Sequence, residues 1–130
     1  MVRIGGTHLR PDHVVQIEHQ LTEFLAVKQP FLKHCYTLKQ LAEDTRIPLH
    51  HLSAFINQHY GMHFNDLINY YRVHHCKLKL LNEEWKHKKL EAIGMESGFN
   101  NRNTFSTAFK KVIGVSPSQY IKDITQTHST

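Results

Sequence analysis

The hydrophobic residues of this chain recur at the spacing of buried helix faces, and the pattern is clearest between residues 90 and 117. A short apolar run with Leu90 and Ile93 ends at a glycine, Gly98. A second run follows, with apolar residues at positions i, i+3, i+4 and i+7: Phe105, Ala108, Phe109 and Val112. The pattern predicts two short helices joined by a tight glycine turn.

The outer face of the second predicted helix carries hydrogen-bond donors and cations, and no acidic residue lies among them. Its members are Arg102, Asn103, Ser106, Thr107, Lys110 and Lys111. This arrangement indicates a helix-turn-helix unit, whose second helix enters the major groove of DNA. An ordinary helical hairpin with a polar outer face is the alternative.

An internal repeat favours the helix-turn-helix interpretation. Residues 90–121 match residues 38–68 when the sequence is shifted by 52 positions and one extra residue is allowed in the turn of the later copy. The matched pairs are Leu38 with Leu90, Leu41 with Ile93, Ala42 with Gly94, Ile47 with Phe99, Leu52 with Phe105, Ile56 with Phe109, Gly61 with Gly114 and Ile68 with Ile121. A repeated pattern of this kind indicates one supersecondary unit built twice.

Two further helices complete an all-α fold, in which a long connecting helix joins two helix-turn-helix subdomains behind an extra N-terminal helix. The extra helix starts at Pro11 and ends before Pro30, because the residue ahead of a proline disfavours the α region. The connecting helix, 64–82, is apolar on two sides and therefore packs on both. Residues 1–10 lack periodicity and are predicted to be a mobile lead-in.

The two copies carry a recognisable signature. Ile93-Gly94-x-x-x-Gly98-Phe99 is followed by NRNTFSTAFKKVIGVSPSQY at 101–120, after a weaker copy and a connecting helix. Over residues 37–123 the chain resembles the DNA-binding domain of the AraC/XylS family of bacterial transcription regulators. The resemblance implies sequence-specific binding of duplex DNA, with two recognition helices in successive major-groove segments. It also implies transcription control, RNA polymerase as a further partner, and a separate sensing or dimerisation domain.

The resemblance also implies the domain boundaries. Residues 1–35 form the lead-in and first helix, residues 36–124 the DNA-binding domain, and residues 125–130 a flexible tail. Within the domain, the first helix-turn-helix is expected at 38–60, the connecting helix at 64–82 and the second helix-turn-helix at 89–113. Arg46 and Pro48 depart from the family, which usually has Gly and Ser at these positions; a non-Gly residue in a left-handed conformation costs ~1–2 kcal/mol.

The expected DNA contacts differ between the two recognition helices. In the second helix, Arg102 can donate two bonds to guanine and Asn103 can pair both ways with adenine. Ser106 and Thr107 follow one turn later, while Lys110 and Lys111 are expected to touch phosphates. In the first helix, 49–59, the family's base-reading positions hold His50, Ser53, Ala54 and Asn57. Their chemistry is weak, since Ala54 offers only a methyl contact, so the first unit mostly positions the protein.

The distribution of charge agrees with a polyanionic partner. The formal net charge is +5, and residues 1–71 hold six Lys and Arg against six Asp and Glu. Residues 72–130 hold ten against five, so the whole excess lies there, although a merely soluble basic domain is the alternative. Cys35 and Cys76 do not form a disulfide pattern and are interpreted as reduced thiols of a cytoplasmic protein. No apolar run approaches the ~20 residues needed to span a bilayer, so no membrane contact is expected.

Three other functions are alternatives to DNA binding. Twelve histidines, with the pairs His50-His51 and His74-His75, invite a metal-binding protein. Adjacent helical residues point in different directions, however, so neither pair can share one metal as an i, i+4 pair does. No glycine-rich phosphate loop, nucleophile elbow or converging carboxylates indicate an enzyme, and no cofactor or metal is expected. A helical module that binds only protein is the remaining alternative, and it predicts no salt-dependent affinity for duplex DNA.

Overall fold

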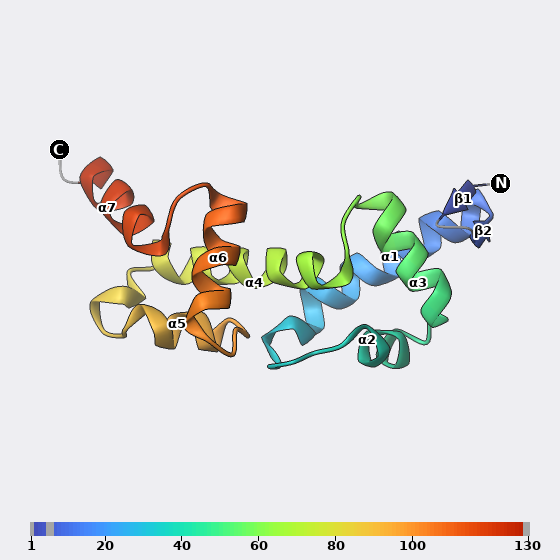
Figure 1. The fold of residues 1–130 in the computed structure, drawn as a ribbon, viewed down its shortest axis with the longest axis horizontal. Coiled ribbons are helices and arrows are strands. Elements are labelled where there is room, and N and C mark those ends of the chain that lie inside the picture. The colour runs from blue at the N-terminus through green and yellow to red at the C-terminus, as the bar shows by residue number, and fades with distance from the viewer. Residues whose placement is uncertain (1, 5–6, 129–130) are drawn as a thin grey trace. The chain divides into compact units, whose positions relative to one another are not determined.

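The computed structural model describes residues 2–4 and 7–128, and within them helices dominate, which confirms the all-α fold class (Figure 1). The α-helices are α1 (Pro11–Lys28), α2 (Leu38–Thr45), α3 (Leu49–His59), α4 (Phe64–Leu81), α5 (Leu90–Glu96), α6 (Arg102–Ile113) and α7 (Pro117–His128). Two short 3-10 helices, η1 (Pro30–Leu32) and η2 (Glu84–Lys86), lie in the connections. The chain forms two compact units, Met1–Ile68 and Asn69–Thr130.

The first described residues form a pair of short strands, which the lack of periodicity in residues 1–10 did not indicate. Strand β1 (Val2–Ile4) pairs with β2 (Thr7–Leu9) in antiparallel register, with Val2 opposite Leu9. Both strands lie against α3. Gly5 and Gly6, which follow β1, lie outside the described residues. A Gly-Gly dipeptide between two short segments is a hairpin signal, but strands of three residues are too short to establish a period.

The core of the first unit forms between α1, α2, α3 and the start of α4. Helix α1 buries Ile17, Leu21 and Leu25, which recur every four residues and so lie on one face. They pack in a unit whose other buried side chains include Leu41, Leu52, Phe55, Ile56, Leu67 and Ile68. A capping box fixes the start of α2: the Thr37 hydroxyl accepts from the amide of Gln40 at 3.1 Å, and the Gln40 side chain accepts from the Thr37 amide at 2.8 Å.

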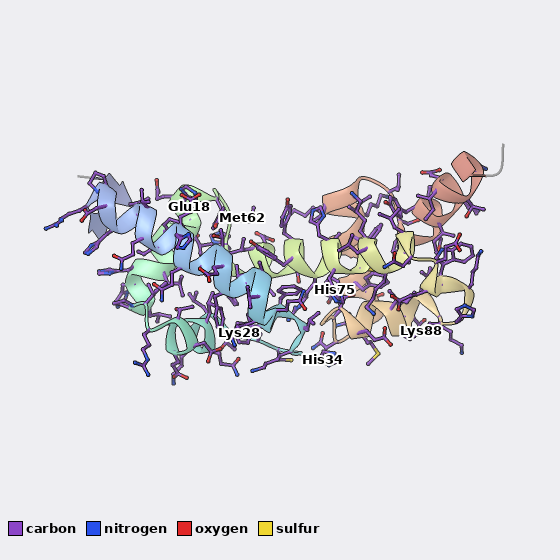
Figure 2. All side chains as sticks on the ribbon, turned by 180° about the vertical axis from the view of Figure 1, so that it is seen from behind. Glu18, Lys28, His34, Met62, His75 and Lys88 are labelled. Atoms are coloured by element: carbon purple, nitrogen blue, oxygen red, sulfur yellow. The ribbon has the colours of Figure 1, made fainter. Side chains whose placement is uncertain are left out.

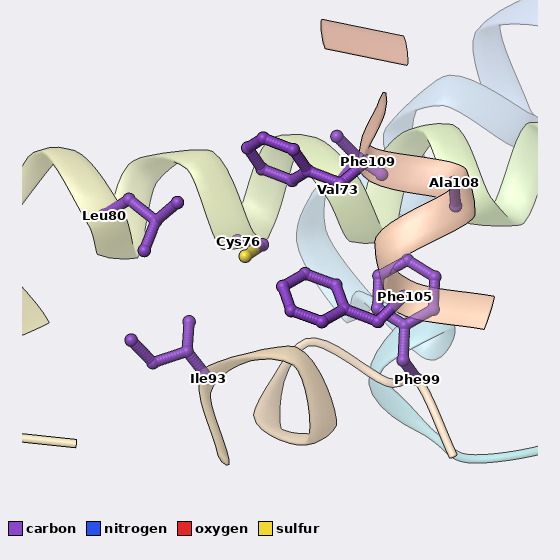
Figure 3. Close-up of a cluster of buried hydrophobic side chains, with 8 residues drawn as sticks. All are labelled: Val73, Cys76, Leu80, Ile93, Phe99, Phe105, Ala108 and Phe109. Carbon is purple, nitrogen blue, oxygen red and sulfur yellow. The ribbon is translucent and has the colours of Figure 1, made fainter. Parts of the chain in front are cut away.

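The core of the second unit is an aromatic cluster between α4, α5 and α6 (Figure 3). Its buried members are Val73, Cys76, Leu80, Ile93, Phe99, Phe105, Ala108 and Phe109. The rings of Phe99 and Phe105 lie 5.4 Å apart between centroids, and those of Phe105 and Phe109 lie 6.1 Å apart. Trp85 of η2 is partly buried and packs against this cluster.

Helices α5 and α6 approach each other closely at Gly94. A Cβ atom built on Gly94 would lie 2.7 Å from Cδ2 and 2.8 Å from Cγ of Phe105, which is closer than two carbon atoms can approach without displacement. The close approach therefore requires glycine at this position. This approach places α5 directly against the ring of Phe105, which anchors α6 in the core.

The end of the chain is helical for longer than predicted. Helix α7 begins where Ser116 caps it, because the Ser116 hydroxyl accepts from the amide of Gln119 at 3.1 Å. Pro117 occupies the first helical position, which needs no amide donor. The helix continues to His128, past residue 125 where the tail was predicted to begin, and residues 129 and 130 lie outside the described residues. Tyr120 anchors α7 against Phe109, with ring centroids 5.7 Å apart.

Candidate nucleic-acid interface

A tight turn joins α5 to α6. Helix α5 ends at Glu96, and Gly98 adopts the left-handed conformation, φ 106°, that favours glycine. Phe99 then enters the core. Helix α6 starts at Arg102 behind Asn101, whose side-chain oxygen accepts from the amide of Thr104 at 2.8 Å. The cap and the buried ring together fix the direction in which α6 leaves the turn.

The two faces of α6 lie as the sequence predicts. Phe105, Ala108 and Phe109 are buried. The predicted outer face is at the surface: Arg102, Asn103, Thr107, Lys110 and Lys111 are exposed and Ser106 is half-buried. An exposed row of donors and cations without a carboxylate on the same helix can bind an anionic, hydrogen-bonding surface. The individual base and phosphate contacts of these residues stay predictions.

Arg102 has an acidic neighbour that the sequence analysis missed. Its Nη1 atom lies 3.3 Å from Oε1 of Glu91 in α5, and the two side chains are 76% and 57% exposed. The pair spans the turn and joins the first residue of one helix to the second residue of the other. No helical spacing links these positions, so no periodic signal in the sequence could have paired them.

The charged segment between α4 and α5 has its own ion pairs. Lys79 lies 3.2 Å from both Glu84 and Glu96, and Lys88, labelled in Figure 2, lies 3.3 Å from Glu84 and 3.0 Å from Glu96. The hydrogen bond from Lys79 holds the pKa of Glu84 below its usual value, and that from Lys88 does the same for Glu96. Lys88 is therefore partnered by carboxylates of its own unit.

Helix α3 presents a smaller polar surface than predicted. His50 and Asn57 are exposed and Ser53 is half-buried. Ala54 is only 5% exposed, so the prediction that it faces outward and contacts a base is wrong. The helical period places Ala54 away from the buried Leu52, but the strands β1 and β2 also lie against α3. The period of one helix cannot indicate what else packs on it.

The turn before α3 keeps the two departures from the family pattern. Arg46 follows α2 in the left-handed conformation, φ 60° and ψ 25°, where a side chain is strained. Pro48 caps α3 without a side-chain hydrogen bond. Gln20 supports this turn from α1, since its Nε2 donates to the Thr45 carbonyl at 2.6 Å.

The histidines and cysteines do not form a site within the described part of the chain. Among the residues described there, no three His, Cys, Asp or Glu side chains lie close enough together to hold a metal ion. His75, labelled in Figure 2, has Nδ1 3.0 Å from the Ser97 hydroxyl, and burial lowers its pKa. Burial raises the pKa of the Cys76 thiol to about 12, which suits a core residue. No described helix has both the length and the apolar character needed to cross a membrane.

Comparison with known proteins agrees with this geometry. The model of a helix-turn-helix domain family matches residues 41–123. A protein of unknown function from Listeria innocua is similar in structure, with a TM-score of 0.65 and 30% identity over 82% of this chain and 94% of the other. The C-terminal domain of AraT, a response regulator from Geobacillus stearothermophilus, has a TM-score of 0.66 and 28% identity over 90% of this chain and 88% of the other. No curated protein sequence matches the chain. The family match, over more than half of the chain, shows that the protein belongs to the AraC-type family of helix-turn-helix DNA-binding domains that regulate transcription.

Proposed function

We propose that the protein binds duplex DNA sequence-specifically through two helix-turn-helix units, with α6 and α3 in adjacent major-groove segments. The observation that carries the proposal is the outer face of α6, where donors and cations are exposed above a buried aromatic face. The charge of the second unit supports it, because residues 69–130 hold ten Lys and Arg against five Asp and Glu.

The residues of α6 divide into two roles in this proposal. Arg102 and Asn103, on the first turn, read base edges, with Ser106 and Thr107 beside them, because a recognition helix contacts bases mainly through its N-terminal residues. Lys110 and Lys111, on the last turn, contact phosphates and position the protein without specifying sequence.

The first unit contributes less to readout. His50, Ser53 and Asn57 are its candidate contacts on α3, and none of them carries the two-donor fork of an arginine. The first unit therefore mainly positions the protein on the duplex. As further parts of this proposal, the protein acts in the cytoplasm together with RNA polymerase and with a sensing or dimerisation domain. The Geobacillus neighbour is itself the C-terminal domain of a response regulator.

Fluorescence anisotropy with labelled duplexes tests the proposal. Wild-type protein first selects preferred sites from a random duplex library, and single base-pair variants of the preferred site are then titrated at several salt concentrations. Affinity should fall steeply with salt, because each neutralised phosphate releases counterions. A salt-independent affinity, or no preference among duplexes, would contradict sequence-specific DNA binding and favour a module that binds only protein.

Two substitutions separate the proposed roles. Arg102→Ala should cost ~1–3 kcal/mol on the preferred duplex and relax preference at one base pair. Lys110→Ala should weaken binding to all duplexes alike and reduce the salt slope by about 1. An unchanged preferred sequence in Arg102→Ala would show that the division of roles on α6 is wrong.

A further inference from the structure

The ion pair between Glu91 and Arg102 joins the two helices of the second helix-turn-helix across their turn. Glu91 lies in the first turn of α5 and Arg102 is the first residue of α6, with 3.3 Å between Oε1 and Nη1. The side chain of Arg102 is 76% exposed on the face proposed to read bases. The guanidinium has no second ion pair among the described residues. Among the described residues, the carboxylate of Glu91 is therefore the only charged group that restrains the guanidinium of Arg102.

The fold does not depend on this pair. The close packing of Gly94 on Phe105 already fixes α5 against α6, and the ring of Phe99 packs beside Phe105. An ion pair between side chains as exposed as these contributes little to stability, because water screens it. Arg102 also lies at the N-terminus of α6, where the helix dipole disfavours a cation. The effect of the pair is therefore on the guanidinium of Arg102 itself. Glu91 holds this group at the N-terminus of α6, where the helix dipole alone does not favour a cation.

We infer that Glu91 is a positioning residue for Arg102 and so determines how strongly one base pair is read. The inference rests on the proposed function. The guanidinium has five donors in a rigid planar fork, and one carboxylate oxygen near Nη1 leaves most of them for another acceptor. Guanine presents two acceptors in the major groove that match such a fork. Restraining a long side chain before binding lowers the cost of ordering it in the complex, and that gain applies only where the fork meets the correct base.

The test compares Glu91→Gln with Glu83→Gln on the selected duplex and its single base-pair variants. Glu83 is a matched control, because it pairs with Lys86 at 3.1 Å, is 56% exposed and lies in the same unit, with a partner other than Arg102. Both variants lose one negative charge, so both should bind all duplexes somewhat more tightly. Only Glu91→Gln should lower the discrimination at the base pair read by Arg102, by roughly fivefold, the low end of what one paired arginine–guanine contact contributes. Equal discrimination in the two variants would overturn the inference.

A second comparison tests whether Glu91 acts through Arg102. In an Arg102→Ala background, Glu91→Gln should not change discrimination further, because the side chain that it positions is absent. A further loss of the same size in that background would overturn the inference, since Glu91 would then act on DNA directly. These outcomes differ from failure of the proposed function, in which the wild-type protein itself would show no preference among duplexes.

Discussion

Replacing Gly94 by alanine tests how tightly the second helix-turn-helix is packed. The added Cβ would meet three ring atoms of Phe105, at 2.7, 2.8 and 3.0 Å. The ring has little freedom to move away, because Phe105 is only 3% exposed and is flanked by the rings of Phe99 and Phe109. Either the ring or the whole of α6 must shift to accept one methyl group.

Two effects of opposite sign decide the outcome of Gly94→Ala. Alanine favours a helix over glycine by about 1 kcal/mol, which would stabilise α5. Forcing a carbon atom into a packed core costs about 1–3 kcal/mol, and the contacts below 3.0 Å place Gly94 at the upper end. We therefore expect a net loss of about 2 kcal/mol in the free energy of unfolding. The melting temperature should fall by several degrees, since 1 kcal/mol corresponds to roughly 2–8 °C in domains of this size range.

Circular dichroism during heating and urea unfolding measures the effect, and a second substitution checks its cause. In the first copy of the repeat, Ala42 occupies the position of Gly94 and Leu52 that of Phe105. The double variant Gly94→Ala, Phe105→Leu reproduces that combination and should lose less stability than the sum of the two single variants. Additive losses, or a Gly94→Ala variant at least as stable as wild type, would refute the clash.

Three further predictions follow from the backbone, the thiols and the acidic residues. Arg46→Gly should raise the free energy of unfolding in urea by about 0.5–1 kcal/mol. The substitution removes ~1–2 kcal/mol of strain from the left-handed conformation, and the greater freedom of glycine in the unfolded chain offsets only part of this gain. An unchanged or lower stability would argue against strain at this turn. A chromogenic disulfide reagent at mildly alkaline pH should react with Cys35 in the folded protein. Cys76 should react only after unfolding, because its thiol is buried and its pKa is raised to about 12. Two equally fast phases would contradict this. The pKa of Glu84 is lowered in the folded state by Lys79, so its contribution to stability is present above the ordinary pKa of glutamate and is lost as the pH falls through the folded-state pKa. Urea unfolding at neutral and acid pH should therefore show a weaker acid dependence in Glu84→Gln than in wild type, and equal dependences would show that the pairing adds nothing.

Features that depend on a single helix were predictable from the sequence. The buried face of α6 follows from the spacing of Phe105, Ala108 and Phe109, and the caps at Thr37 and Ser116 follow from side chains that can accept a free amide. Each of these signals lies within a few residues along the chain, so no knowledge of distant contacts was needed.

Features that depend on two separate segments were not predictable. Ala54 was expected outside because only the core side of α3 could be inferred, whereas β1 and β2 pack on that helix as well. The pairing of Glu91 with Arg102 depends on the angle at which α6 leaves the turn. The extension of α7 to His128 follows a polar stretch, where local composition indicates a tail rather than a helix.

The position of Trp85 gives the second unit a spectroscopic reporter of its own. It is the only tryptophan in the chain, and it packs against the aromatic cluster of that unit, where its Nε1 atom is buried. The first unit has no indole, but it has an exposed thiol, Cys35, that can carry a dye. The fluorescence of Trp85 and that of a dye on Cys35 can therefore follow the thermal unfolding of each unit separately, without any amino-acid substitution. A difference between the two unfolding midpoints measures how independently the two copies of the repeat unfold.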